Sequence, residues 1–206
     1  MQLRTAITCL VSLLTLSLGA CQMNVSMYDG PDAGYAVASI AVSKGSTYSN
    51  VQLDFRSRDG KSDSYLFWVN DEAVLAPAAD FRSATEHGGV ATLRLRPGQY
   101  EFYSFGVTAP DLGYTPRVAF SVPITIEPGK VTYLGQYLTL GLPKEGLFGG
   151  EILGAPYFVI SDQQARDVPL AVRQTPALGA LLVVNRVPDP AKLGVPYFRS
   201  TPMPRS

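Results

Sequence analysis

The chain has 206 residues, with 17 Lys and Arg balanced by 17 Asp and Glu, one histidine and two cysteines. The balanced charge, without any basic run, argues against a nucleic-acid partner. A single histidine and the lack of a cysteine cluster argue against zinc sites of the usual kinds.

A charged start and an apolar run open the chain. Arg4 precedes the stretch AITCLVSLLTLSL at residues 6–18, and the small residues Gly19 and Ala20 follow. This order is typical of a secretory signal peptide, and the run is shorter than the roughly 20 residues that a membrane span needs. We therefore assign residues 1–20 to a signal peptide.

The leader ends on a cysteine. The sequence Leu18-Gly19-Ala20-Cys21 resembles the lipobox of bacterial lipoproteins, in which the cysteine thiol receives a diacylglycerol and the leader is cut just before it. The resemblance implies that Cys21 is the lipidation site and that the chain is held on a membrane. The alternative is an ordinary cysteine beside a conventional cleavage site. Cys9 leaves with the leader, so neither an intramolecular disulfide nor a thiol metal site can form.

The residue after the lipid cysteine bears on location. In enteric lipoproteins an aspartate there favours the inner membrane, and this chain has Gln22. The resemblance therefore implies an outer-membrane anchor with the domain facing the periplasm. Residues 21–34 are small, polar and turn-rich, and we expect them to form a lipidated tether.

Residues 35–185 carry the patterns of a β domain. Val51, Leu53 and Phe55 alternate with polar residues, which is typical of a half-buried strand. Asp59-Gly60 then predicts a hairpin turn. SYLFWV at 64–69 and ATLRLR at 91–96 predict further strands.

Two Pro-Gly pairs predict two more hairpins. Pro97-Gly98 and Pro128-Gly129 each separate two strand-like segments and fit a type II turn. We expect Leu93, Leu95, Ile124 and Ile126 in the core. The returning segments carry four aromatic residues, which are Tyr100, Phe102, Tyr133 and Tyr137. These could form a sugar-binding platform, but packing is the commoner role of such residues.

The last third of the chain is less regular. Glycine-rich residues 141–155 predict a long loop. Ser161 and Gln164 have the spacing of a capping box, so we expect a short helix near 162–168, limited by Pro169. A buried strand should follow at 180–185.

The five prolines of residues 186–206 predict an extended tail outside the sheets. Tyr197 and Phe198 are the expected docking points of this tail.

Two sets of residues could carry catalysis. His87 lies before two glycines, which favours a loop without a chemical role. Asp54, Asp59 and Asp63 surround the first hairpin and could serve a hydrolase, but neighbouring basic residues favour a solvated turn. We therefore expect no catalytic residue, no cofactor and no metal.

Together these segments resemble a known group of proteins. The L-x-PG-x-Y segment, PGKVTYLGQY and VISDQQARDVPLA…TPAL are similar to segments of uncharacterised proteobacterial outer-membrane lipoproteins. The resemblance covers roughly residues 35–180 and implies a prealbumin-like (transthyretin-like) β-sandwich. The expected fold is thus mainly β, an antiparallel sandwich with one short helix.

Three functions remain open from the sequence. The first is a non-catalytic envelope lipoprotein that binds or braces a protein or cell-wall partner. The second is an accessory lipoprotein of a secretion or pilus assembly. The third, which we favour least, is an envelope hydrolase.

Overall fold

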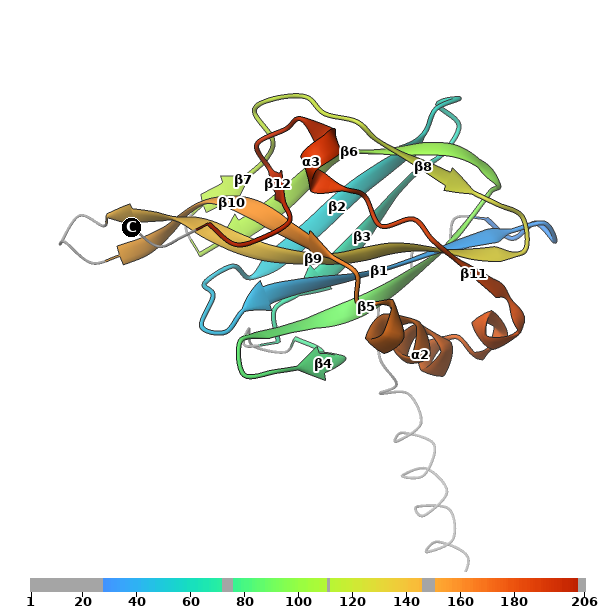
Figure 1. Cartoon of the computed structure of the whole chain (residues 1–206), viewed down its shortest axis with the longest axis horizontal. Helices are drawn as coiled ribbons and strands as arrows, with labels where there is room; N and C mark the ends of the chain where they lie inside the picture. Colours follow the sequence, from blue (N-terminus) through green and yellow to red (C-terminus); the bar gives the residue numbers. More distant parts are fainter. Residues whose placement is uncertain (1–27, 72–75, 111, 146–150, 204–206) are drawn as a thin grey trace, which may run out of the picture.

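The protein folds into two packed β-sheets, with helix α2 (Gln164–Gln174) on the outside of one of them (Figure 1). The computed structural model describes residues 28–71, 76–110, 112–145 and 151–203. The expected β-sandwich is confirmed. The predicted signal peptide at residues 1–20 and the predicted lipidation site Cys21 lie outside the described residues.

The larger sheet has seven strands, in the order β12-β10-β9-β1-β5-β4, and β11 also pairs with β9. Its strands are β1 (Gly34–Ser43), β4 (Phe81–Arg82), β5 (Glu86–Leu95), β9 (Lys130–Glu145), β10 (Glu151–Ser161), β11 (Leu182–Asn185) and β12 (Phe198–Arg199). Three of its pairings are parallel, namely β1 with β9, β9 with β11 and β10 with β12. The sandwich is therefore mixed, whereas the sequence predicts an antiparallel one.

The smaller sheet has five strands, in the order β3-β2-β6-β7, and β8 also pairs with β6. Its strands are β2 (Asn50–Ser57), β3 (Asp63–Val69), β6 (Gly98–Ala109), β7 (Leu112–Tyr114) and β8 (Val122–Ile126). All of its pairings are antiparallel. The Asp59-Gly60 hairpin is confirmed, because β2 and β3 pair on either side of it and Gly60 has φ 70°.

The expected core is also confirmed. Leu93, Leu95, Ile124 and Ile126 are all buried. Three of the four aromatic residues (Tyr100, Phe102 and Tyr137) pack between the sheets. Tyr133 is buried on the opposite face of the larger sheet, because Gly135 (φ 94°) and a register shift in the β1–β9 pairing accompany a change of face along β9. Packing, rather than sugar binding, accounts for these residues.

The two Pro-Gly hairpins are wrong. Leu95 pairs with Gly34 in the larger sheet, whereas Gly98 pairs with Ile126 in the smaller one. The chain therefore crosses from one sheet to the other at Pro97-Gly98. It crosses back at Pro128-Gly129, between β8 and β9, where Gly129 has φ 63°. The strands on either side of each crossing bury their apolar residues in the same core. Their alternation of apolar and polar residues therefore looks the same as in a hairpin.

The long loop predicted at 141–155 is largely strand. β9 continues to Glu145, β10 begins at Glu151, and the two pair up to these residues. Beyond Thr139 no pairing of β9 with β1 is recorded, so β9 and β10 project as a two-stranded arm (left in Figure 1). The glycine content of this segment therefore belongs to a hairpin and not to a long loop. Residues 146–150 lie outside the described part.

The predicted helix forms, but its bounds and its cap are wrong. Helix α2 spans Gln164–Gln174 and includes Pro169. Ser161 is the last residue of β10, and the first helical N–H groups bond to Asp162 Oδ1 (2.9 Å) and the Gln163 carbonyl. Leu170 and Ala171 are buried against the sheet, and this burial offsets the one bond that proline removes. A 3₁₀ turn at Pro176–Ala180 follows.

The C-terminal segment is not an extended tail outside the sheets. Asp189 caps the one-turn helix α3 (Pro190–Leu193), with proline at its first position and Gly194 (φ 65°) after its end. This order of residues suits a helix, although the proline content argues against one. Phe198 then pairs with Phe158 in β12 and is buried in the core. The docking of Tyr197 and Phe198 is confirmed, and it is deeper than expected.

The strand predicted at 180–185 is present as β11, but it lies at an edge, with Leu182 64% exposed. No helix among the described residues is both long and apolar enough to cross a bilayer.

Candidate functional site

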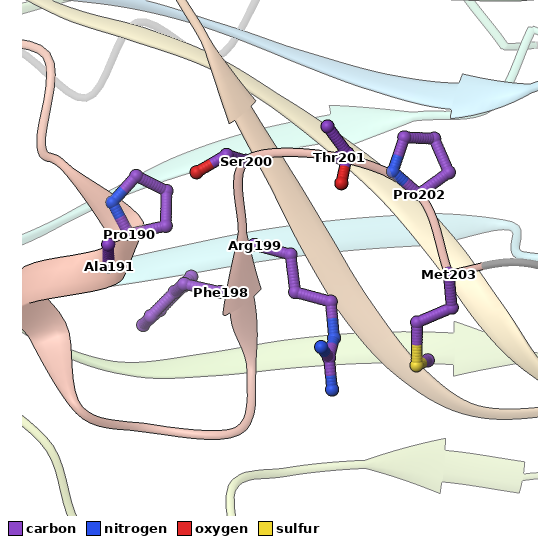
Figure 2. Close-up of a pocket in the computed structure, with 8 residues that line it drawn as sticks. All are labelled: Pro190, Ala191, Phe198, Arg199, Ser200, Thr201, Pro202 and Met203. Atoms are coloured by element: carbon purple, nitrogen blue, oxygen red, sulfur yellow. The ribbon is translucent and has the colours of Figure 1, made fainter.

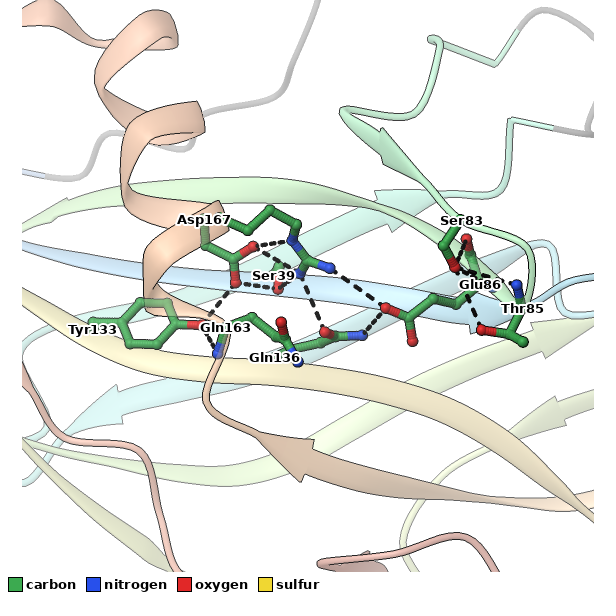
Figure 3. A network of polar contacts seen from close by, with 9 residues as sticks. Ser39, Ser83, Thr85, Glu86, Tyr133, Gln136, Gln163 and Asp167 are labelled. Atoms are coloured by element: carbon green, nitrogen blue, oxygen red, sulfur yellow. Dashed lines mark hydrogen bonds and ion pairs between the residues drawn. The ribbon is translucent and has the colours of Figure 1, made fainter.

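A buried polar cluster fastens α2 to the outer face of the larger sheet (Figure 3). Asp167 is fully buried, and its Oδ2 accepts hydrogen bonds from Ser39 Oγ (2.6 Å) and Tyr133 Oη (2.7 Å). Its Oδ1 accepts from Arg166 Nε (2.7 Å). Strands β1 and β9 thus hold the carboxylate from below while the helix supplies it from above.

The guanidinium of Arg166 completes the cluster. It lies 3.5 Å from the ring centroid of Phe81 and donates to Gln136 Oε1 at 3.2 Å and to Glu86 Oε1 at 3.4 Å. Gln136 Nε2 in turn donates to Glu86 (3.0 Å). Each charged group of the cluster therefore has a partner of opposite charge or a polar partner, as a buried ionic network requires.

Tyr133 shows that this cluster is structural. Burial, followed by the charge of Asp167, raises the pKa of the Tyr133 hydroxyl well above its ordinary value. The hydroxyl stays protonated, donates to Asp167 and accepts from the Gln163 N–H at 3.1 Å. Its donor and one of its acceptor positions are thus engaged in placing the helix.

His87 lies in strand β5, so the predicted loop is wrong. Its ring is 1% exposed, with Nε2 at 2.9 Å from Asn70 Oδ1 and 3.3 Å from Asp71 Oδ1. The amide nitrogen of Asn70 donates to the Tyr48 carbonyl, which leaves Oδ1 to accept from a protonated Nε2. The ring also meets Trp68 edge to face. These contacts give His87 a place in the core.

The glycines after His87 serve close packing. A Cβ on Gly88 would lie 2.1 Å from the Ile40 carbonyl oxygen, and one on Gly89 would lie 2.5 Å from the Trp68 ring. Gly88 thus marks a close approach between neighbouring strands of the larger sheet, and Gly89 marks a close approach between the two sheets, not the turn that the sequence suggests.

The structure does not bring the three aspartates of the first hairpin together in one place. Asp54 faces outward from β2 and accepts from Gln52 at 2.5 Å, while Asp59 lies in the turn and accepts from the Lys61 N–H at 3.1 Å. Asp63 begins β3 and pairs with Arg56. Asp54 and Asp63 therefore share the outer face, with a basic residue beside them, and Asp59 does not join them.

That outer face carries an aromatic surface that the sequence patterns missed. Along β3, Tyr65 and Phe67 are half-buried and face away from the core, because Ser64, Leu66 and Trp68, which alternate with them, face inward. The register places Tyr65 opposite Asp54 and Phe67 opposite Gln52. The signal was the apolar character of SYLFWV on both of its faces, which predicts that both faces meet a partner.

The neighbouring strand extends the same surface. The guanidinium of Arg56 lies 4.4 Å from the ring centroid of Tyr103 and binds Glu101 at 2.6 Å. Hydrogen bonds from the Ser121 hydroxyl and from Arg56 lower the pKa of Glu101. We call Tyr65, Phe67, Tyr103 and Arg56 the aromatic face. Helix α2 packs on β1, β5 and β9 of the other sheet, so it does not cover this face.

A shallow pocket of about 320 Å³ lies along the C-terminal segment (Figure 2). Phe198, Arg199, Pro202 and Met203 line it. The Tyr157 hydroxyl accepts from the Met203 N–H at 3.1 Å, and the Tyr197 hydroxyl accepts from the Arg117 and Val118 N–H groups, both at 2.7 Å. These bonds fix the segment in place. Within the described part of the chain, no group of three His, Cys, Asp or Glu is placed to hold a metal ion.

No protein-family model matches the chain, and no curated protein matches it. One solved structure that resembles it in part is a "putative cell adhesion protein" from Bacteroides ovatus. The two are 15% identical with a TM-score of 0.28, and the match covers 52% of this chain and 39% of that chain. The present chain therefore matches about two fifths of the other protein, and a likeness of this degree says nothing about what it binds.

Proposed function

We propose that this protein is an envelope lipoprotein, anchored through a lipid on Cys21, that binds another envelope protein without catalysing a reaction. The sequence of the leader supports the anchor. Only residues 22–27 separate Cys21 from Tyr28, the first described residue, and such a segment reaches at most about 25 Å when extended. The sandwich would therefore stay close to its membrane.

The aromatic face is the observation that carries the binding function. Tyrosine, phenylalanine and arginine are enriched in the central regions of protein interfaces, where they dominate affinity. Arg56 is already held over Tyr103 by its ion pair with Glu101, so little side-chain entropy would be lost on binding. An outer face that extends over three adjacent strands suits a protein partner better than a small ligand.

The side chains that could act as an acid or a base are bound to other protein groups, and this supports a non-catalytic function. His87 is enclosed by Asn70, Asp71 and Trp68 inside the sandwich. Asp167 and Tyr133 are used in holding α2. A general acid or base must reach a substrate, and these groups face other protein groups instead.

The arm formed by β9 and β10 favours a second function, the accessory lipoprotein of a secretion or pilus assembly. The arm extends beyond the last recorded β1–β9 pair, Val42–Thr139, and Leu142 on it is 38% exposed. This pair of strands offers a contact surface at the end of the domain opposite to the start of β1 (Figure 1).

Site-specific photo-crosslinking in intact cells tests the proposal. A photoreactive residue at Phe67, in the aromatic face, should give one discrete crosslinked protein, and Phe67→Ala should reduce capture from a neighbouring photoreactive residue at Tyr103. The matched control position is Arg173, which is exposed on α2. Equal products from Arg173 and Phe67, or a glycan as the product, would contradict the proposal. A product from Leu142 alone would favour the second function.

A further inference from the structure

The end of the sandwich where the described chain begins holds a basic pocket. The β2–β3 turn and the β5–β6 crossing flank a hollow of about 330 Å³. Its charged lining consists of Arg58, Lys61 and Arg96 with one acidic residue, Asp59, and its neutral polar lining includes Ser62 and Gln99. Both connections lie at the end opposite to the β9–β10 arm (right in Figure 1).

The charge of this pocket is unbalanced. Lys61 lies 3.5 Å from Asp59, and these two charges offset each other. Arg58 and Arg96 are exposed, and no ion pair with a carboxylate is recorded for either among the described residues. Two arginines therefore line one hollow, whereas the Ser57 hydroxyl is engaged within the turn, where it accepts from the Lys61 and Ser62 N–H groups at 3.1 Å and 2.9 Å. Guanidinium groups suit phosphate oxygens.

The start of the described chain lies against the same pocket. The guanidinium of Arg96 is 5.2 Å from the ring centroid of Tyr28, and Arg94 donates to the Gly30 carbonyl at 3.0 Å. The six residues 22–27 join Tyr28 to Cys21 and reach about 25 Å at most. A lipid on Cys21 would thus hold the pocket next to a layer of headgroups.

We propose that this basic pocket docks on the phosphate groups of anionic phospholipids in the membrane that holds the anchor. The inference rests on the proposed function, because the lipid on Cys21 brings the pocket to the membrane. Contact at this end fixes the orientation of the sandwich, with the β9–β10 arm pointing away from the membrane. The aromatic face then stands along the side of the domain, open to a partner.

Vesicle binding by the chain without its lipid tests the docking alone. Residues 22–206 contain both groups of buried apolar side chains, which lie between residues 33 and 198, so this segment retains the whole core. It should bind phosphatidylcholine vesicles that contain about 30% phosphatidylglycerol more tightly than pure phosphatidylcholine vesicles. The preference should vanish as salt rises from about 0.1 M to about 1 M.

Reversing the charge of the two pocket arginines tests whether the vesicles bind at this pocket. Arg58→Glu and Arg96→Glu should each lower the partition coefficient on anionic vesicles by about fivefold or more. Lys44→Glu, an exposed change near the other end of β1, should lower it less than twofold. Equal binding to both kinds of vesicle, or equal effects of the three changes, would overturn the proposal. A lack of lipid on Cys21 would refute the proposed function but would leave this result unaffected, so the two failures can be told apart.

Discussion

Replacing Phe198 with alanine tests whether the C-terminal segment belongs to the core. The side chain is 4% exposed, and its ring centroid lies 5.5 Å from that of Phe102, 5.2 Å from that of Phe120 and 6.0 Å from that of Phe158. A buried phenylalanine removes roughly 200 Å² of apolar surface from water, which at about 25 cal/mol per Å² stabilises the fold by about 5 kcal/mol. Alanine keeps part of this, so we expect a loss of about 3–5 kcal/mol, the usual range for such changes.

Urea unfolding of residues 22–206 at 25 °C measures this loss. Phe198→Ala should lower the midpoint with an unchanged slope, and Phe198→Leu should lose less than about 1.5 kcal/mol because most of the volume is kept. The control is Leu182→Ala, because Leu182 is 64% exposed and should change stability by no more than about 0.5 kcal/mol. A loss below about 1 kcal/mol for Phe198→Ala would show that the segment lies outside the core in solution.

Two substitutions and a rise in pH further test the packing of the larger sheet. Asp167→Ala should cost about 3–5 kcal/mol in urea unfolding, because it removes the carboxylate on which the buried cluster converges; a loss near zero would refute its role. Gly88→Ala should cost about 3 kcal/mol or more in the same assay, because its Cβ would meet a strand carbonyl at 2.1 Å, whereas Gly113→Ala, with open space around it, should be nearly neutral. Burial raises the pKa of Tyr133 and of Tyr137 above the ordinary value of 10.0, so the folded state holds these protons more tightly than the unfolded state. Their contribution to stability is then complete below pH 10 and falls as the pH rises beyond it, and urea midpoints that stay constant to pH 11 would contradict this.

The strands and the inner core were predictable because their signals are local. Val51, Leu53 and Phe55 alternate with polar neighbours and are all buried. Asp59-Gly60 joins strands that pair with each other, so both the turn and its partners lie within a few residues. In such cases a short window of sequence contains the whole interaction.

The two Pro-Gly connections were not predictable in this way. A hairpin and a crossing between sheets both place apolar residues on the core side, so Leu95 and Tyr100 show the same pattern in either arrangement. What distinguishes the two is the pairing of Leu95 with Gly34 and of Gly98 with Ile126. These partners are distant in sequence, and no local preference encodes them.

The same limit applies to the candidate site. The glycine after His87 suggests a turn, yet it is required by the approach of the Ile40 carbonyl from another strand. Tyr65 and Phe67 look like core residues in a run of apolar side chains, and only their register with Gln52 and Asp54 places them on the outer face. The C-terminal prolines argue against regular structure, but the burial of Phe198 depends on a pocket built by β6 and β10.

The intact mass of the mature protein tests the central claim most directly. Protein extracted from membranes should begin at Cys21 and carry the added mass of a diacylglycerol and an amide-linked acyl chain, and Cys21→Ser should remain unprocessed and lack that mass. A mature chain that begins at Cys21 without lipid, or a Cys21→Ser variant that is cut at the same place, would show that residues 1–20 are an ordinary signal peptide and would contradict the anchor.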